Sequence, residues 1–390
     1  MSIFRKTLSC AVLAALGTCA LAGCARQDTP NETAASASPE ASAAITETVS
    51  ESTASSEQTS SSETSGAQPA ETEPAVSAAP SVDDSTPYGQ HGALHVENGK
   101  LTDADGNTVQ LYGMSTHGIA WFPQYINYDS FRTLRDDWNT NCIRLAMYTA
   151  EYGGYCAGGD KEQLKQLVRD GVSYATELGM YVIVDWHILS DCNPNQNKDE
   201  AIAFFREISE TFADNDNVLY EICNEPNSGT SWDSIKSYAE EVIPVIREQK
   251  PDAVILVGTP TWSQEIDKAA ASPLTFDNVM YTLHFYAGTH KDDLRNRLET
   301  CAQNNLPVFV SEFGMCDASG NGANDFDSTT KWLDLLNKYQ ISFCCWNLAN
   351  KDESSSVFKA ASTTLSDWTD EDFNESGRWI REYFRSMPQN

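Results

Sequence analysis

Short apolar runs alternate along the chain with longer stretches in which apolar residues recur at helical spacing. The short runs are apolar on both faces, which predicts buried parallel strands, and the longer stretches predict amphipathic helices. The predicted strands are VQLYGMST (109–116), CIRLAMY (142–148), YVIVDWH (181–187), VLYEICNEP (218–226), VILVGTP (254–260), VMYTLHFYA (279–287), PVFVSEFG (307–314) and SFCCWNLAN (342–350). The predicted helices between them cover 129–138, 161–179, 201–213, 235–249, 292–304 and 328–339.

This alternation over eight strands predicts one large α/β domain with the architecture of a (β/α)8 TIM barrel. A doubly wound open sheet is the alternative, but no glycine-rich phosphate loop follows the first predicted strand. Ahead of the barrel, residues 94–113 predict an N-terminal β-hairpin, because the turn pair Asn98-Gly99 separates two strand-like segments.

The chain begins with segments of a different composition. Residues 1–24 combine a basic start, an apolar run and small residues, which predicts a secretory signal peptide. Its ending LAGC resembles the bacterial lipobox, whose cysteine becomes the lipidated first residue of the mature chain; Cys24 would then anchor the protein to a membrane surface. A plain signal peptide with a chance cysteine is the alternative. Residues 25–86 are rich in Ser, Thr, Ala, Glu and Pro and predict a disordered linker, so the folded domain is expected over 87–390.

The charge and the cysteines narrow the function further. With 26 Lys and Arg against 56 Asp and Glu, the formal net charge is −30, and nucleic acid is not expected as a partner. Eight cysteines fall in the predicted domain without paired CxxC spacing, which argues against zinc. They are Cys142, Cys156, Cys192, Cys223, Cys301, Cys316, Cys344 and Cys345. Disulfides are possible after export and free thiols in an anaerobic habitat, and the sequence leaves both open.

Polar and aromatic residues gather where the predicted strands end. Active sites of such barrels lie at the carboxyl ends of the strands. The residues at these ends are His117, Arg144, Tyr148, His187, Asn224, Glu225, His284, Tyr286, Glu312 and Trp346. Two of them, Glu225 and Glu312, are carboxylates that follow the fourth and seventh strands. We expect these strands to face each other, so that the two side chains converge over the barrel axis.

Two convergent carboxylates without metal-ligand spacing suit acid–base and nucleophilic chemistry on a glycosidic bond. One carboxyl group must be protonated and the other ionised. The negative charge of the ionised carboxylate raises the pKa of the neighbouring carboxyl group, and partial burial adds to this effect. Arg144, expected near the rim, would keep one of the two ionised.

Several short motifs resemble glycoside hydrolase family five, close to its bacterial endo-β-1,4-glucanases. They are STHG followed by Trp121, IRLAMY, DWH, NEP, HFYA, SEFG and NLANKDESS, in this order along residues 88–387. The resemblance implies that Glu225 is the general acid/base and Glu312 the nucleophile of a retaining double displacement. Their carboxyl groups should then lie about 5 Å apart.

The resemblance also implies roles around this pair. Asn224 would bond the sugar 2-hydroxyl, Arg144 and Tyr286 would orient Glu312, and His284 would neighbour Glu225. The residues expected to line the sugar site and the glycone side are His187, His117, Trp121, Tyr148, Trp346, Lys351 and Glu353, and Trp262 is a candidate for the aglycone side. Alternatives are core packing for Trp121, Trp346 and Trp262, and a solvated surface pair for Lys351 and Glu353. Asp185 is expected to be structural.

The sequence therefore predicts a secreted, lipid-anchored, monomeric retaining endo-β-1,4-glucanase that acts on β-1,4-linked glucan without a metal or organic cofactor. The same fold acting on mannan, xylan-type or mixed-linkage glucan is the nearest alternative. An alternative of another class is a surface lipoprotein that captures oligosaccharides without cleaving them. Two crowded carboxylates argue against it, because a binding protein gains nothing from them.

Overall fold

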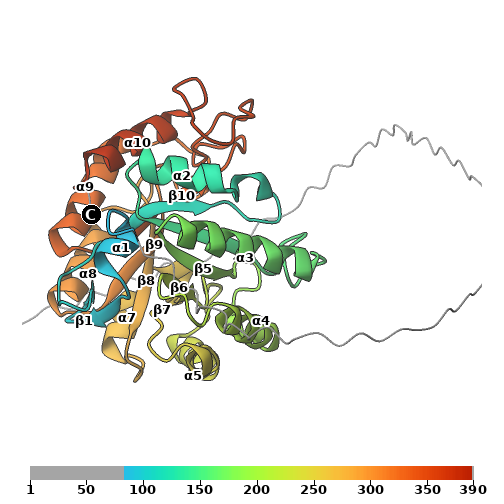
Figure 1. The fold of residues 1–390 in the computed structure, drawn as a ribbon. Coiled ribbons are helices and arrows are strands. Elements are labelled where there is room, and N and C mark those ends of the chain that lie inside the picture. Colours follow the sequence, from blue (N-terminus) through green and yellow to red (C-terminus); the bar gives the residue numbers. More distant parts are fainter. Residues whose placement is uncertain (1–82, 389–390) are drawn as a thin grey trace, which may run out of the picture. The chain divides into compact units, whose positions relative to one another are not determined.

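The computed structural model describes residues 83–388 and confirms the (β/α)8 barrel. Eight parallel strands close in the order β10-β3-β4-β5-β6-β7-β8-β9, so the last strand of the chain pairs with the first strand of the barrel (Figure 1). They are β3 (Tyr112–Thr116), β4 (Cys142–Tyr148), β5 (Tyr181–His187), β6 (Val218–Glu221), β7 (Ile255–Val257), β8 (Val279–Tyr286), β9 (Val308–Gly314) and β10 (Phe343–Leu348). Each lies within a predicted strand. The predicted signal peptide with Cys24 and the linker up to residue 82 lie outside the described residues.

Helices surround the strands (Figure 1). The six predicted helices are present as α2 (Tyr128–Asp136), α3 (Lys161–Glu177), α4 (Lys198–Thr211), α5 (Trp232–Gln249), α8 (Asp292–Gln303) and α9 (Phe326–Tyr339). Capping residues fix where they begin, as Asp160 does for α3 by accepting from the backbone N–H groups of Glu162 and Gln163. The sequence analysis missed η1 (Pro123–Tyr125), η2 (Pro194–Asn197), α6 (Pro260–Ser263), α7 (Ile266–Ala271) and the C-terminal α10 (Glu375–Ser386).

The N-terminal segment closes the end of the barrel at which the strands begin. Helix α1 (Pro87–His91) starts at Thr86, whose side chain accepts from the N–H of Gly89, so folded contacts begin slightly before residue 87. The predicted hairpin follows as β1 (His95–Glu97) and β2 (Lys100–Thr102). Asn98 and Gly99 both have positive φ, 51° and 79°, as a tight two-residue hairpin turn requires.

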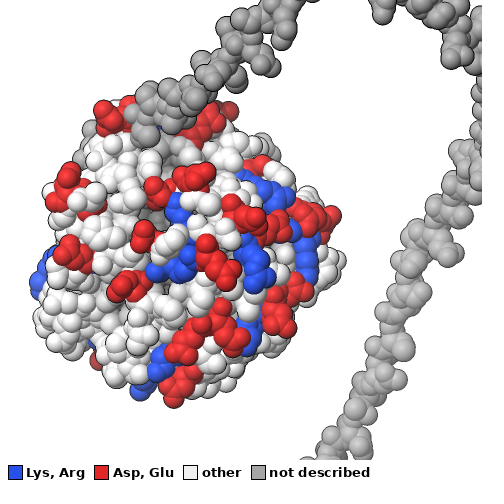
Figure 2. Space-filling model, turned by 60° about the horizontal axis from the view of Figure 1, so that its bottom comes forward, with Lys and Arg blue, Asp and Glu red and all other residues white. Residues whose placement is uncertain are grey.

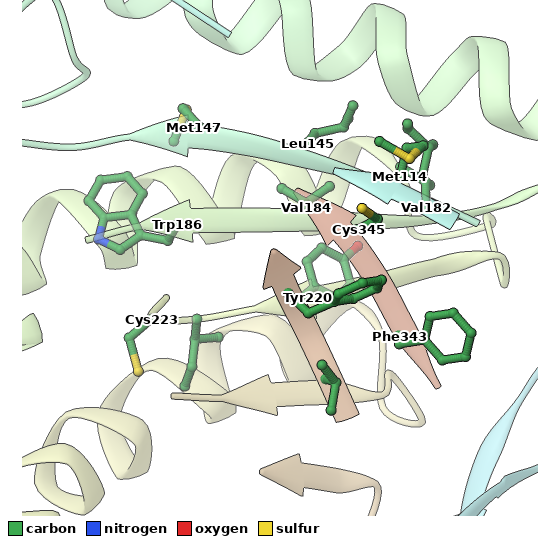
Figure 3. Close-up of a cluster of buried hydrophobic side chains, with 14 of the residues drawn as sticks. Met114, Leu145, Met147, Val182, Val184, Trp186, Tyr220, Cys223, Phe343 and Cys345 are labelled. Atoms are coloured by element: carbon green, nitrogen blue, oxygen red, sulfur yellow. The ribbon is translucent and has the colours of Figure 1, made fainter. Parts of the chain in front are cut away.

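Side chains inside the barrel form an apolar floor below a polar layer. The floor contains Leu111, Cys142, Ile183, Leu219, Leu256, Phe309 and Cys344. The polar layer above it is fully or almost fully buried and contains Arg144, Asp185, Glu221, His284 and Ser311. Because the side chains of a strand alternate, the residues between these positions face the helices. Figure 3 shows two of them, Leu145 and Met147 of β4, on the same side of the strand.

Strand β9 interrupts this alternation near its carboxyl end. Its register against β8 shifts between the pairs Thr282↔Phe309 and His284↔Glu312, and its register against β10 also shifts. One extra residue of β9 therefore lies in a bulge, which turns consecutive side chains to the same face. Ser311 and Glu312 consequently both reach the barrel interior, where they bond Glu221 and Arg144.

Both signs of charge are present on the surface (Figure 2), and the cysteines of the described residues form no disulfide bonds. Acidic and basic side chains lie interspersed on the face shown in Figure 2. Within residues 83–388 the eight cysteines are free thiols, and Cys156 and Cys192 alone among them are partly exposed. Cys344 faces the barrel interior and Cys345 the helical layer, as strand alternation predicts. No helix in the described part of the chain is long and apolar enough to span a membrane.

Candidate active site

A cleft of about 700 Å³ opens at the carboxyl ends of the strands. Most predicted site residues line it: His117, Trp121, Tyr148, His187, Glu225, Trp262, His284, Tyr286, Glu312, Trp346, Lys351 and Glu353. Arg144 and Asn224 do not, because both are fully buried beneath the cleft. Arg144 therefore lies deeper than the rim position expected from the sequence, and the expected bond of Asn224 to the sugar 2-hydroxyl stays a prediction.

Glu225 and Glu312 meet at the bottom of the cleft. One carboxylate oxygen of each lies within 4.8 Å of the other, close to the separation predicted from the sequence. Their side chains are 13% and 5% exposed, so both are reachable but largely removed from water. The strands that carry them, β6 and β9, are three positions apart around the barrel, so the expectation of directly opposite strands was wrong. Their side chains still converge because Glu312 follows the β9 bulge into the interior.

Arg144 joins three carboxylates under the cleft. Its Nε donates to Glu221 at 2.7 Å, its Nη2 lies 2.9 Å from Asp185, and its Nη1 lies 3.2 Å from Glu312. All four groups are almost completely buried, where charge interactions are strong. A single positive charge is thus shared among three acids, and Glu312 has the longest contact.

The position of Glu312 raises its pKa above the ordinary glutamate value. Burial disfavours its charged form, and the neighbouring Glu225 adds to this effect. His284, Arg144 and a 2.8 Å hydrogen bond from Tyr286 Oη oppose the shift without cancelling it. The contacts predicted for Arg144 and Tyr286 are present, but they do not return the pKa of Glu312 to its ordinary value.

His284 connects Glu225 to the polar layer. Its Nδ1 lies 2.9 Å from Glu225 Oε1, and its Nε2 lies 2.9 Å from Ser311 Oγ. Burial alone would lower the pKa of His284, but the acids Glu221, Glu225 and Glu312 raise it to about 9. The imidazole is therefore a cation at neutral pH and donates from both nitrogens, as the predicted neighbour of Glu225.

Asn224 is held by a complete set of partners. Its Oδ1 accepts from Arg144 Nη2 at 2.6 Å, and its Nδ2 faces His187 Nε2 at 3.2 Å and the Ile188 carbonyl at 3.1 Å. His187 Nδ1 in turn lies 2.6 Å from Asp185, and burial holds the pKa of His187 well below its usual range. Neutral His187 thus donates to Asp185 and accepts from Asn224. Asp185 orients these groups, which fits its expected structural role.

Aromatic and polar groups form one wall of the cleft. Tyr148 packs against His187 and Trp121, with ring centroids 4.0 and 4.7 Å away, and Trp346 packs on His117 at 5.1 Å. Trp121 is 36% exposed and faces the cleft, which argues against core packing. These rings offer apolar faces that match the C–H surfaces of a sugar.

Lys351 and Glu353 lie in the same wall. Lys351 Nζ lies 2.6 Å from Glu353, whose carboxylate is 3.7 Å from His117 Nε2. The Glu353 side chain is only 9% exposed, whereas that of Lys351 is 47% exposed, so the expected surface pair is solvated at Lys351 and buried at Glu353. Their polar atoms are placed to bond sugar hydroxyl groups.

Trp262 lies on the other side of the cleft, after β7. It is 45% exposed, which rules out core packing for this ring. Thr261, Trp262 and Ser263 all have φ between 53° and 59°, a left-handed conformation that is costly for residues with a side chain. Ser263 Oγ donates to the carbonyl of Asn224 and anchors this turn beside Glu225. Backbone strain of this kind accumulates at functional sites.

Within the described residues, one cluster has a geometry that could hold a metal ion. It consists of Glu225, His284 and Glu312, whose potential ligand atoms lie within 4.8 Å of one another. Both ring nitrogens of His284 already have partners, since Nδ1 lies 2.9 Å from Glu225 Oε1 and Nε2 lies 2.9 Å from Ser311 Oγ. The chemistry of this set favours proton transfer over metal binding.

The sequence analysis missed several residues of the site. Glu221 and Ser311 link Arg144 to His284, and the alternation of their strands could have placed them inside the barrel. Gln264 and His290 line the cleft beside Trp262, and Glu151 lines the opposite wall. These three lie in loops beyond the strand ends, where no spacing rule marks a position.

Comparisons with known proteins identify the family. Residues 102–352 match the model described as Cellulase (glycosyl hydrolase family 5). The chain is 50% identical over 293 residues to endoglucanase A of Butyrivibrio fibrisolvens, covering 74% of this chain and 68% of that protein. It is 47% identical over 294 residues to an endoglucanase of Clostridium saccharobutylicum, covering 75% and 64%. The chain thus spans about two thirds of the length of these curated relatives.

A solved structure supports the same assignment. The catalytic domain of a Thermobifida fusca endoglucanase Cel5A variant in complex with cellotetraose has a TM-score of 0.74 and 42% identity to this chain. The match covers 77% of this chain and 100% of that one. The family model and the identity to these relatives show that the chain belongs to glycosyl hydrolase family 5.

Proposed function

We propose that the protein is a retaining endo-β-1,4-glucanase that cleaves internal bonds of β-1,4-linked glucan. The observation that carries this proposal is the separation of Glu225 and Glu312, whose oxygens approach within 4.8 Å. This is close to the roughly 5–5.5 Å of retaining enzymes and shorter than the roughly 6.5–9.5 Å that lets a water attack beside the sugar ring in inverting ones, so it suits direct attack by one carboxylate. The endoglucanases among the relatives and the cellotetraose in one related structure support a glucan substrate.

In the first step, Glu225 donates its proton to the glycosidic oxygen while Glu312 attacks the anomeric carbon from the opposite face. The bond to the leaving sugar breaks, and an ester bond forms between Glu312 and the glycone. His284 stabilises the Glu225 carboxylate left after proton transfer, since its Nδ1 lies 2.9 Å from Oε1. Tyr286 donates a hydrogen bond to Oε1 of Glu312 and so holds this carboxylate in position for the attack.

In the second step, Glu225 acts as a base and takes a proton from water. The water oxygen bonds the anomeric carbon from the side the leaving sugar vacated, and the ester bond to Glu312 breaks. Two inversions give a product with the configuration of the substrate.

The acid limb of the pH profile should reflect the position of Glu312. Glu312 must be ionised to attack, and its pKa is raised. Activity therefore falls with decreasing pH through a value above about 4.3, the pKa of an exposed glutamate. Tyr286→Phe removes a hydrogen bond that lowers this pKa, so the limb should move to still higher pH. The measurement is kcat/KM against pH for both proteins; a limb that moves to lower pH in the variant would contradict this reading.

Reducing-sugar release from carboxymethylcellulose, mannan and xylan tests the proposed function. We expect release from carboxymethylcellulose in excess of the other two, and none above background with Glu312→Ala. A higher release from mannan or xylan would show that this polysaccharide is the substrate, with the fold and mechanism unchanged. Equal release by wild type and variant would refute an enzymatic role and leave the capture of oligosaccharides.

We also propose that the protein is exported and anchored by lipid at Cys24, on the basis of the LAGC sequence. Mass spectrometry of the mature N-terminus tests this, since an acylated Cys24 is expected, and an unmodified residue at that position would refute the anchor. The expected monomeric state stays a prediction, which sedimentation can check.

A further inference from the structure

Glu221 is a buried acid that the proposed reaction does not use. It is the last residue of β6, and its side chain is fully buried beneath the cleft. A substrate in the cleft cannot contact it, and it takes part in neither of the two proposed steps. A buried carboxylate destabilises a fold unless partners satisfy both of its oxygens. The partners of Glu221 therefore indicate its role.

Both oxygens of Glu221 accept short hydrogen bonds. Oε2 accepts from Arg144 Nε at 2.7 Å, and Oε1 accepts from Ser311 Oγ at 2.6 Å. Burial alone would raise the pKa of Glu221, but Arg144 and His284 hold it below the ordinary glutamate value. Asp185 also contacts Arg144, yet its Oδ1 has no partner among the described residues, and burial raises its pKa well above the usual range. Of these two acids, Glu221 is the one that carries a fixed negative charge.

Ser311 connects this charge to His284. A serine hydroxyl holds a single proton, and Ser311 donates it to Glu221. The Ser311 oxygen therefore accepts from Nε2 of His284 at 2.9 Å, so Nε2 carries a proton. The same Nε2 lies 3.8 Å from Glu221 Oε1. The bulge in β9 makes this connection possible, because it turns Ser311 and Glu312 to the same face.

The other ring nitrogen of His284 faces the acid/base residue. Nδ1 lies 2.9 Å from Glu225 Oε1, whereas Glu225 Oε2 bonds no protein group within residues 83–388 and is not buried. His284 thus holds Oε1, and Oε2 is the oxygen that is open to the cleft. A positively charged donor at Oε1 stabilises the carboxylate that forms when Oε2 gives up its proton. The other titratable groups around His284 are Glu221, Glu312, Asp185 and neutral His187, and Arg144 bonds the first three.

We propose that Glu221 is a positioning residue for proton transfer: through Ser311 it fixes His284 as a hydrogen-bond donor from both ring nitrogens, so that a positive charge stabilises the Glu225 carboxylate left when the leaving sugar takes its proton. This inference rests on the proposed function, since it assigns that proton transfer to Glu225. Glu221 itself exchanges no proton with the substrate and acts only through Ser311 and His284.

The substitution Glu221→Gln should reverse the hydrogen bonds of this chain. It keeps the size of the side chain and removes the charge. Arg144 Nε can only donate, so it selects the oxygen of the new amide and leaves the NH₂ group to donate to Ser311. Ser311 then donates to Nε2 of His284, and the ring is neutral with its proton on Nδ1. The contacts stay in place, but the positive charge beside Glu225 is lost.

Leaving-group dependence tests the proposal. Cellotetraose has a leaving sugar that needs a proton, whereas the leaving group of 2,4-dinitrophenyl β-cellobioside needs none. For Glu221→Gln we expect the ratio of kcat/KM for cellotetraose to that for the dinitrophenyl substrate to fall about tenfold, a part of what a general acid contributes. A changed hold of Arg144 on Glu312 would alter both values alike and leave the ratio unchanged. The matched control is Glu177→Gln, on the exposed face of α3, whose ratio should equal that of wild type.

A second variant guards against misfolding of Glu221→Gln, which circular dichroism detects. Ser311→Ala removes the connecting hydroxyl and leaves Glu221 bound to Arg144. The same ratio should fall less, by about threefold, because Glu221 Oε1 stays 3.8 Å from Nε2. If Glu221→Gln does not fold, an unchanged ratio in Ser311→Ala refutes the proposal.

Nitrogen-15 NMR of the histidine rings at neutral pH gives a readout that does not depend on activity. His284, one of six histidines, is assigned by the loss of its signals in His284→Gln. We expect Nε2 of His284 to be protonated in the wild type and unprotonated in Glu221→Gln. If Nε2 is the same in both proteins, or if the kinetic ratio is unchanged in the folded variant, the proposal is refuted while the proposed function stands. If the wild type cleaves neither substrate, the proposed function fails, and the spectra still decide whether Glu221 fixes the proton on His284.

Discussion

Glu312→Ala is expected to lower kcat/KM on carboxymethylcellulose by a factor on the order of 10⁴ or more, because it removes the proposed nucleophile. Such a factor corresponds to about 5.5 kcal/mol of transition-state stabilisation. None of the three acids closest to Glu312 in the site can replace it. Asp185 and Glu221 are fully buried and bound to Arg144 below the cleft, and Glu225 is needed for proton transfer. Reducing-sugar assays with purified proteins give the measurement.

Azide distinguishes loss of the nucleophile from loss of the fold. In the cavity left by Glu312→Ala, azide should attack an activated aryl β-cellobioside once and give the α-glycosyl azide, with inverted configuration. Glu97→Ala, in the hairpin at the other end of the barrel, is the control and should keep full activity. Circular dichroism of both variants checks folding. A β-glycosyl azide, or a loss below about 100-fold with an intact fold, would contradict the assignment of Glu312.

The sequence was sufficient for the architecture and for the centre of the site. The strands are short apolar runs, and a parallel barrel places their carboxyl ends on one rim, so Glu225, His284 and Glu312 could be grouped without coordinates. Their separation followed from the family resemblance and from the chemistry of a double displacement. The expected hairpin also follows from local turn chemistry at Asn98-Gly99.

How deep a side chain lies inside the barrel could not be predicted from its position near the end of a strand. Arg144 is the third residue of β4 and lies one layer below the cleft, which a list of polar residues near strand ends does not reveal. The bulge in β9 places Ser311 and Glu312 on the same face, against the simple alternation of side chains. Gln264 and His290 lie in loops, whose course depends on tertiary contacts such as that between Arg297 and the Gln264 carbonyl.

Glu225→Ala is expected to lower activity on carboxymethylcellulose by about 10³-fold, within the range for loss of a general acid. The reason is that the leaving sugar is a poor leaving group and needs the proton that Glu225 supplies. With 2,4-dinitrophenyl β-cellobioside, whose leaving group needs no proton, the first step should be almost as fast as in wild type. The second step still lacks its base, so kcat falls, KM falls with it, and kcat/KM changes little.

Azide should restore kcat of Glu225→Ala on the dinitrophenyl substrate, because this anion needs no general base to attack the glycosyl ester on Glu312. The product should be the β-glycosyl azide, opposite to that of Glu312→Ala, since azide here enters after one inversion has occurred. His284 can help to hold the anion, because in the wild type its Nδ1 lies 2.9 Å from Glu225 Oε1 and so faces the position of the lost carboxylate. An equal loss of kcat/KM on both substrates would show that Glu225 acts through structure and not through proton transfer. An α-glycosyl azide would exchange the roles assigned to Glu225 and Glu312.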